Sequence, residues 1–315
     1  MRVLVTGGAG FIGSHVVDAL LGQGHEVAVL DDLSSGRREN LPPGVTLYQV
    51  DLRDRPATAR AVADFRPRAV SHQAAQASVA VSVRQPHLDA DINVLGGLSL
   101  LDACTSPGSK VERLVFASTG GAIYGEVPEG ERASERTPPA PQSPYAIHKL
   151  TFEQLLLAYG RYRDLGSTVL RYANVFGPRQ DPHGEAGVVA SFFEAARKGH
   201  PLRVNARKTA GDPGCVRDYV FVSDVARANV LALSGAVQER ALNVGSGSGT
   251  TTLELAQAIL ACTRRELALE HGPPREGDLG RSVLDPTLAA RYLGKLVSLT
   301  DGLHLTHDFH ASRSG

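Results

Sequence analysis

A tyrosine and a lysine that could move a proton together lie four residues apart in the segment Ser143-Pro144-Tyr145-Ala-Ile-His-Lys149. Ser143 and Pro144 are typical of a helix start, a capping residue followed by proline in the first turn. Tyr145 and Lys149 are therefore predicted to share one face of that helix. A free tyrosine, with a pKa of about 10, is a weak base at neutral pH. An ammonium beside it favours the phenolate, so the pair predicts acid–base chemistry at a carbon that bears a hydroxyl.

Taken alone, this spacing is also typical of an ordinary helix surface, and a glycine-rich segment near the start of the chain decides between the two interpretations. RVLVT (2–6) is a short apolar run predicted to form a buried strand. Gly7, Gly10 and Gly13 follow at three-residue spacing, before a helical pattern over 15–24. Glycines in this order allow a tight turn and let a pyrophosphate approach the helix N-terminus. The alternative is a glycine-rich turn that binds no ligand.

An acid at the end of the next predicted strand sets the expected cofactor. EVAVL (26–30) leads directly into Asp31, about 20 residues beyond the glycines. A carboxylate in that position accepts hydrogen bonds from the adenosine ribose and repels a 2′-phosphate. We therefore expect NAD rather than NADP, with the nearby Arg37 as the residue that opposes this preference.

Ten motifs, these among them, resemble the extended short-chain dehydrogenase/reductase family and, within it, the UDP-glucose 4-epimerases. The resemblance runs from Arg2 to about Phe309. It is carried by TGGAGFIGSH (6–15), DDLSSG (31–36), DLRD (51–54), SHQAAQASV (71–79), FASTGGAIYGE (116–126), SPYAIHK (143–149), LRYANVFGPRQ (170–180), RDYVFVSDVA (217–226), NVGSG (243–247) and PREGD (274–278).

The resemblance implies a set of NAD contacts that runs from the pyrophosphate through the ribose and adenine to the nicotinamide. In chain order these are Gly7, Gly10, Phe11, Ile12, Gly13, Asp31, Asp32, Ser35, Gly36, Asp51, Leu52, Ala74, Ala75, Gln76 and Asn93, together with Tyr145 and Lys149. Asp32 stands where the family usually has asparagine, which leaves one cofactor contact open. No metal site is expected.

The resemblance also implies a catalytic hydroxyl and a set of substrate contacts. Thr119 matches the family's Ser or Thr, but one extra residue before Tyr124 leaves Ser118 as an alternative. Arg217 and Arg275 match arginines that face a diphosphate, and the alternative for Arg275 is a position on a solvated face. The full substrate set is Thr119, Asn174, Val188, Asn205, Arg217, Arg275, Asp278 and Ser282.

The resemblance implies 4-epimerisation of a UDP-sugar through a transient 4-keto sugar. Ser282 falls at a position that is either Tyr or a small residue, so UDP-GlcNAc is expected beside UDP-glucose unless this loop is shifted. Gly120 and Gly121 occupy the place where 4,6-dehydratases carry an Asp-Glu pair. UDP-glucuronate 4-epimerase, or another NAD-dependent sugar-nucleotide enzyme, remains the alternative. A non-catalytic NAD-binding sensor is a remote one, because it predicts erosion of Tyr145 and Lys149.

Strand and helix patterns alternate up to about residue 174 and indicate how these residues are positioned. The expected strands are 2–6, 26–30, 45–50, 68–72, 111–117 and 167–172, and the expected helices lie near 11–23, 55–64, 87–104 and 145–163. Such alternation predicts an α/β fold, a doubly wound parallel Rossmann sheet, joined to a smaller mixed α/β substrate-binding lobe. We expect residues 1–174 to form the NAD-binding domain, with segments near 219–247 returning to it. Residues 175–315 would form the interlaced lobe.

Composition excludes several other classes of protein. The 315 residues carry a formal net charge of zero, so nucleic acid is not an expected partner. Three widely spaced cysteines argue against a zinc site or a disulfide framework. A strand predicted from residue 2 and the lack of an 18-residue apolar run favour a cytoplasmic protein that does not contact membranes. The family resemblance adds a homodimer, formed through helices 87–104 and 145–163.

Overall fold

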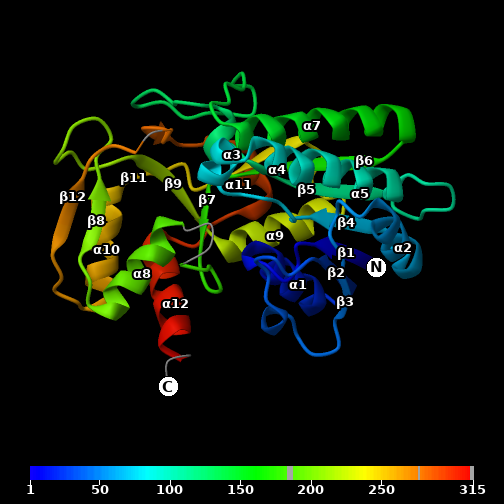
Figure 1. Ribbon diagram of the computed structural model, residues 1–315, viewed down its shortest axis with the longest axis horizontal. Helices are drawn as coiled ribbons and strands as arrows, with labels where there is room; N and C mark the ends of the chain where they lie inside the picture. Colours follow the sequence, from blue (N-terminus) through cyan, green and yellow to red (C-terminus); the bar gives the residue numbers. More distant parts are fainter. Residues whose placement is uncertain (183–186, 276, 313–315) are drawn as a thin grey trace. The chain divides into compact units, whose positions relative to one another are not determined.

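The computed structural model describes residues 1–182, 187–275 and 277–312 (Figure 1). The chain divides into two compact units, each made of separate stretches. The first unit comprises residues 1–119, 141–171 and 225–242, and the second comprises 120–140, 172–224 and 243–315. The expected boundary at residue 174 lies close to the change of unit after residue 171. Residues 120–140, however, belong to the second unit and not to the expected NAD-binding domain.

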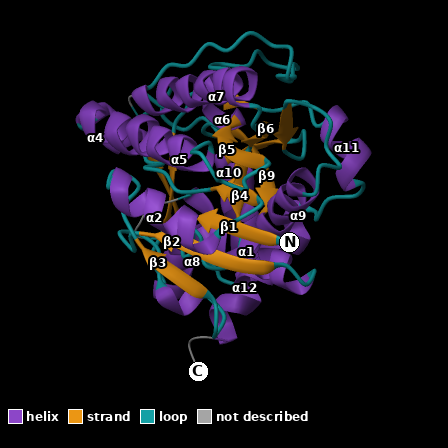
Figure 2. Cartoon of the chain, turned by 90° about the vertical axis from the view of Figure 1, so that its right-hand side faces the viewer, coloured by secondary structure: helices purple, strands orange, loops and turns teal. Residues whose placement is uncertain are grey.

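The first unit is built on a seven-stranded sheet in the order β10-β6-β5-β4-β1-β2-β3. Its strands are β1 (Arg2–Thr6), β2 (Glu26–Asp31), β3 (Thr46–Gln49), β4 (Ala69–His72), β5 (Arg113–Thr119), β6 (Gly166–Tyr172) and β10 (Ala241–Val244). Neighbours from β5 to β3 pair in parallel, with Val5 opposite Val29 and Ser71 in the central strands. The order from β3 to β6 can be followed in Figure 2. This arrangement confirms the predicted doubly wound fold.

Helices cover both faces of this sheet. They are α1 (Phe11–Gly22), α2 (Arg55–Phe65), α3 (Val79–Arg84), α4 (Pro86–Ala90), the π-helical turn η2 (Asp91–Gly96), α5 (Gly97–Cys104), α7 (Pro144–Arg163) and α9 (Val222–Leu233), with a 3-10 turn η1 at Arg38–Asn40. The His72 ring packs against Phe152 of α7, with ring centroids 5.3 Å apart. The next side chain back, Ser71, donates to Asn229 of α9 on the opposite face. Adjacent strand residues point to opposite faces, so α7 and α9 enclose β4 between them.

The helix that carries the Tyr–Lys pair begins where its sequence predicts. The Ser143 hydroxyl accepts a hydrogen bond from the amide of Ala146 at 3.3 Å, and Pro144 occupies the first turn. Phe152 and Leu156 are fully buried and anchor the helix to the sheet core through Phe116, whose ring centroid lies 4.6 Å from that of Phe152. The capping residue and this buried face together fix the position of Tyr145 relative to β5.

The second unit has two small sheets. One contains β7 (Asn174–Phe176), β9 (Val216–Phe221), β11 (Gly249–Thr251) and β13 (Arg281–Ser282), and the other pairs β8 (Leu202–Asn205) with β12 (Leu269–Gly272). Its helices are α6 (Gly120–Ile123), α8 (Val188–Lys198), α10 (Thr252–Thr263), α11 (Thr287–Leu293) and α12 (Leu299–Ser312). Helix α10 packs against α8, α12 and strand β8 (Figure 1). Within the described ranges, no helix combines the length and apolar character needed to cross a bilayer.

Candidate functional site

The glycine loop between β1 and α1 forms a cradle at the helix N-terminus. Gly7 has φ of +65°, and its carbonyl accepts the amide of Gly10 at 3.1 Å. A Cβ on Gly13 would lie 2.0 Å from the Gly7 oxygen, so helix and loop meet more closely than any side chain allows. No side chain caps α1 at Gly10, which leaves the first-turn amides of Phe11, Ile12 and Gly13 directed toward a ligand. These features fit a dinucleotide pyrophosphate.

Asp31, at the end of β2, connects the glycine loop to the turn that follows β2 through hydrogen bonds. One carboxylate oxygen accepts from the amide of Ala9 and the other from that of Leu33, both at 2.9 Å. Burial raises the pKa of Asp31, and the two backbone hydrogen bonds oppose that rise. A carboxylate has about four acceptor sites, so Asp31 keeps capacity for a ribose hydroxyl. The close contact with Gly36 completes the turn, since a Cβ there would lie 2.8 Å from the carboxylate.

The other predicted ribose and adenine residues differ in their surroundings. Asp32 is exposed and accepts from the amide and the hydroxyl of Ser34, which closes a local turn beside the exposed Ser35. Asp51 is bound by the guanidinium of Arg53 at 2.6 Å, and this contact lowers the pKa of Asp51. Leu52 is buried. The carboxylate of Asp51 is therefore already paired with Arg53.

A polar network holds the segment predicted to line the nicotinamide. The Asn93 side chain accepts from the Gln76 amide at 3.0 Å and donates to the Gln76 carbonyl at 2.8 Å. Buried Asp89 accepts from both side chains and also pairs with His148, at 2.5 Å. The loop that starts at Ala74 abuts Gly7, where a Cβ would lie 2.6 Å from the Ala74 amide nitrogen. Ala75 is half-buried in the same loop.

The sequence analysis missed Asp89 and His148, although a signal was present. Asp89 precedes Asn93 by four residues and therefore lies one turn away on the same helix face. His148 directly precedes Lys149. The expected single helix over 87–104 instead contains the π-helical turn that carries Asn93.

Lys149 is buried between the strand and the tyrosine. Its ammonium donates to the carbonyl of Ala117 at 3.0 Å and lies 4.9 Å from the ring centroid of Phe116. The ring centroid of Tyr145 is 5.9 Å from the same nitrogen. The ammonium is thus bound by a backbone carbonyl and lies close to two aromatic rings, one of them that of Tyr145. Its charge therefore acts on the half-buried Tyr145 beside it.

The two hydroxyls at the end of β5 have different roles. Ser118 is buried, and its hydroxyl donates to Glu153 at 2.5 Å. Glu153 in turn forms a buried ion pair with Arg171 at 2.6 Å. Thr119 is half-buried, and its hydroxyl has no hydrogen-bond partner among the residues described in its unit. Of the two hydroxyls, that of Ser118 is therefore already engaged by a buried carboxylate.

His72, at the end of β4, belongs to the core. Its Nδ1 lies 2.7 Å from the Thr6 hydroxyl, and burial lowers the pKa of His72 to about 3, assisted by the charge of Lys149. The ring is therefore neutral at physiological pH and packs between Phe116 and Phe152.

The second unit brings some of the predicted substrate residues together. Ser282 of β13 pairs in register with Arg217 of β9, so their side chains leave the same face of the sheet. Arg217 is half-buried and Ser282 is fully buried. Asn174, on β7, donates its side-chain amide to the carbonyl of Asp218 at 3.2 Å.

The remaining predicted substrate residues lie at the ends of elements. Asn205 ends β8 and is half-buried, and Val188 begins α8. Arg275 and Asp278 are both exposed and joined by a turn, in which the Asp278 amide donates to the Arg275 carbonyl at 3.3 Å. Residue 276 of that turn lies outside the described residues. In the described part of the chain, no group of histidine, cysteine and acidic residues could hold a metal ion.

Comparison with known proteins identifies a family for this arrangement. Residues 3–245 match the NAD dependent epimerase/dehydratase family. A UDP-glucose 4-epimerase of Mycolicibacterium smegmatis is 44% identical over 321 aligned positions that cover 100% of both chains. The crystal structure of the Thermus thermophilus UDP-glucose 4-epimerase complex with NAD superposes with a TM-score of 0.94 at 57% identity, over 99% of this chain and 100% of that one. The Thermotoga maritima UDP-glucose 4-epimerase with UDP-glucose gives 0.92 at 45%, over 100% of both chains.

Proposed function

Since the chain belongs to the NAD dependent epimerase/dehydratase family, we propose that it interconverts UDP-glucose and UDP-galactose by epimerisation at C4. The observation that carries this proposal is the pairing of Tyr145 with a buried Lys149, whose ammonium lies 5.9 Å from the tyrosine ring centroid. Full-length similarity to relatives named UDP-glucose 4-epimerases supports the same substrate class. NAD is the cofactor, as the family description states.

The residues of the first unit divide the acid–base work. Bound NAD supplies a hydride acceptor and donor for C4 of the sugar. Tyr145 removes the proton from the C4 hydroxyl and later returns it, because Lys149 favours the phenolate. Thr119 donates to the same sugar oxygen. The uncapped amides of α1 and the carboxylate of Asp31 hold the dinucleotide at its other end.

The second unit would retain the nucleotide while the sugar turns over. We assign the diphosphate to Arg217, Arg275 and Asn174, and a ribose hydroxyl to Asp278. Guanidinium groups suit this role because their planar donors match phosphate oxygens. Val188 and Asn205 are assigned to the uridine end. Holding one end of the substrate lets both faces of the 4-keto sugar be presented in turn.

We further propose that the enzyme accepts the N-acetyl sugars UDP-GlcNAc and UDP-GalNAc. The support is Ser282, a small side chain in register with Arg217. Replacing it by tyrosine would fill the space that an acetamido group needs. Ser282→Tyr should abolish conversion of UDP-GlcNAc and largely spare UDP-glucose. A wild-type enzyme that ignores UDP-GlcNAc at millimolar concentration would contradict this assignment.

We propose a homodimer because four large side chains of the first unit are exposed on its helices. Val83 of α3, Leu95 of the π-helical turn, and Ile147 and Tyr162 of α7 are large side chains left 47 to 83% exposed. Helices α3 and α7 and the π-helical turn pack on one another, so these residues belong to one helical layer (Figure 1). A second copy would cover them. Ile147→Glu should yield monomers in sedimentation analysis.

The decisive experiment incubates the purified chain with UDP-glucose, UDP-GlcNAc and UDP-glucuronate and resolves the products by chromatography. We expect UDP-galactose without net release of NADH. Conversion of UDP-glucuronate alone would favour the UDP-glucuronate 4-epimerase alternative, and no conversion at all would favour the non-catalytic sensor. Tyr145→Phe should lower turnover by orders of magnitude while UDP and NAD still bind. Near-normal turnover in that variant would remove Tyr145 from the mechanism.

A further inference from the structure

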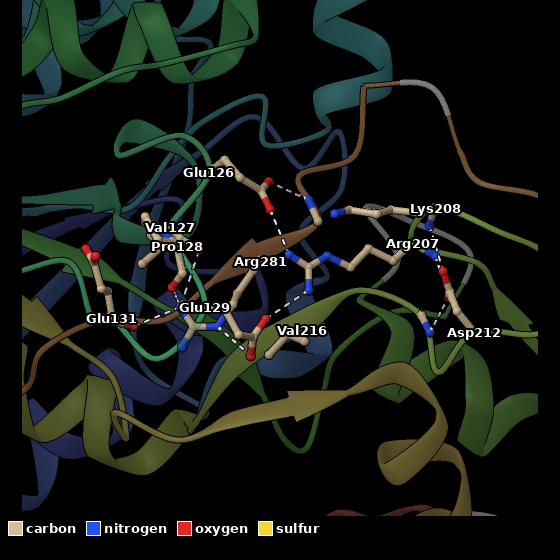
Figure 3. A network of polar contacts seen from close by, with 12 residues as sticks. Glu126, Val127, Pro128, Glu129, Glu131, Arg207, Lys208, Asp212, Val216 and Arg281 are labelled. Atoms are coloured by element: carbon tan, nitrogen blue, oxygen red, sulfur yellow. Dashed lines mark hydrogen bonds and ion pairs between the residues drawn. The ribbon is translucent and has the colours of Figure 1, made fainter.

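Glu126 connects two segments of the second unit that are distant in sequence. One carboxylate oxygen accepts the amide of Gly280 at 2.7 Å, across 154 residues of chain. The other accepts from the guanidinium of Arg207 at 3.2 Å. Figure 3 shows the contact between Glu126 and Arg207. The proposed substrate residues lie close along the chain, with Asn205 two residues before Arg207 and with Asp278 and Ser282 on either side of Gly280.

A second acid extends the same network on the opposite side of the arginine. Glu129 accepts from Arg207 at 3.2 Å and lies 3.8 Å from the guanidinium of Arg281. Arg281 is buried and donates to the backbone carbonyls of Pro128 and Glu131, at 2.5 and 2.8 Å (Figure 3). The segment that contains Glu126 and Glu129 is therefore bonded to Arg281, which directly precedes Ser282.

The loop that follows Asn205 is shaped by its own internal contacts. Asp212 accepts four backbone amides, from Arg207, Lys208, Thr209 and Gly214, at 2.7 to 3.0 Å. Desolvation raises the pKa of Asp212, but the four amides outweigh it and hold that pKa well below its usual range. One carboxylate thus holds the backbone of the loop that carries Arg207.

Gly280 shows how closely the three segments meet. A Cβ at this position would lie 2.7 Å from Nε of Arg207 and 2.8 Å from Oε1 of Glu126. Nε of Arg207 is buried there and makes no hydrogen bond within the described residues. A side chain at position 280 would therefore force Arg207 or Glu126 to shift.

We propose that Glu126 is a positioning residue for the nucleoside diphosphate: through Arg207 and Gly280 it fixes the spacing of the Asn205 segment and the Asp278–Ser282 segment. The inference rests on the proposed function, because it assumes that these two segments hold the UDP group. Glu126 itself touches neither the sugar nor the cofactor in this scheme. Its effect is on how well the binding groups are placed before substrate arrives.

The alternative is an ordinary surface ion pair that serves only stability. The Glu126 side chain is 44% exposed and that of Arg207 is 22% exposed. Pairs this exposed contribute little to folding stability. If Glu126 is a positioning residue, removing its side chain should lower the affinity for UDP and leave the melting temperature almost unchanged. If its role is only structural, the melting temperature should fall and the affinity for UDP should stay the same.

The test titrates UDP into the NAD-loaded, full-length protein by calorimetry and measures kcat and KM for UDP-glucose. We expect Glu126→Ala to raise the Kd for UDP and the KM about tenfold, with kcat within about twofold and bound NAD unchanged. Glu126→Gln keeps one acceptor oxygen and should fall in between. Gly280→Ala, which separates the same segments by steric contact, should also weaken UDP binding. Glu131→Gln is the matched control, because Glu131 uses only its backbone carbonyl in the network.

Each outcome bears on the inference. Unchanged UDP affinity in both Glu126→Ala and Gly280→Ala overturns it. A lower melting temperature with unchanged Kd makes the role structural and also overturns it. If Glu126→Ala does not fold, Glu126→Gln and Gly280→Ala decide by the same criterion. If the wild type neither binds UDP nor converts UDP-glucose, the proposed function fails and the inference fails with it. Normal wild-type conversion with unaffected variants rejects the inference alone.

Discussion

Replacing Gly13 with alanine should weaken NAD binding while the protein still folds. The added Cβ would lie 2.0 Å from the Gly7 carbonyl oxygen and 2.9 Å from Cα of Gly8, both backbone atoms that cannot rotate away. The loop would have to move by roughly 1 Å or more to restore ordinary contact. Forcing an extra carbon into a packed site costs about 1–3 kcal/mol. Alanine's better helix propensity returns only about 0.5–1 kcal/mol.

The net expectation is a loss of about 1–2 kcal/mol in the free energy of unfolding, together with a larger functional effect. The displaced loop carries the first-turn amides of α1, so NAD affinity should fall at least tenfold, about 1.4 kcal/mol. Gly22 provides the matched control, since it ends the same helix and a Cβ there meets nothing within 4 Å. Gly22→Ala should leave NAD content unchanged and increase stability slightly.

The assay combines urea unfolding of NAD-free protein with calorimetric titration of NAD into both variants. Wild-type NAD affinity in Gly13→Ala would refute the argument that this glycine sets the distance between loop and helix. Equal losses of affinity in Gly13→Ala and Gly22→Ala would show that helix α1 responds to any added methyl group, and would refute it as well.

Three further outcomes follow from the first unit. Arg171→Met should lower the free energy of unfolding by about 3–5 kcal/mol, because it leaves the carboxylate of Glu153 buried and unpaired, and adding Glu153→Leu should recover at least half of that loss in urea titrations. The pKa of His72 is about 3 in the folded chain and about 6.5 when unfolded, so the unfolded state binds the proton first and stability falls as pH drops below about 6.5; between pH 6.5 and 5 this fall should be about 2 kcal/mol smaller in His72→Gln. Wild type should bind NAD at least about tenfold more tightly than NADP, and Asp31→Asn should reduce that ratio, as direct titration with both cofactors will show.

Local signals were enough to predict much of the first unit. The start of α7 follows from Ser143 and Pro144, because capping depends only on residues within one helical turn. The glycine spacing predicted the cradle for a similar reason, since Gly7 and Gly13 contact each other across six residues. Strand and helix periodicity supplied the alternation from which a parallel doubly wound sheet follows.

The alternatives left open by the sequence depended on contacts between distant residues. Ser118 and Thr119 are adjacent and chemically alike, and only the position of Glu153, 35 residues after Ser118, engages one hydroxyl and not the other. The π-helical turn that presents Asn93 to Gln76 likewise breaks a pattern that reads as continuous helix. Helical periodicity cannot report such a turn, because it changes the phase of the helix by a single residue.

The sequence by itself determined the fold class, the glycine cradle and the placement of Tyr145 and Lys149 one turn apart on a helix, since each arises within one helix, one turn or one strand–helix unit. Only the tertiary structure decided which segments each acidic side chain contacts, as Glu126 illustrates. Glu126 and Gly280 are 154 residues apart, and the segments that carry them also meet where the amide of Val127 donates to the carbonyl of Arg281 at 3.0 Å. Burial then separates acids of the same type: Glu153 is buried in an ion pair with Arg171, whereas the side chain of Glu129 is 78% exposed.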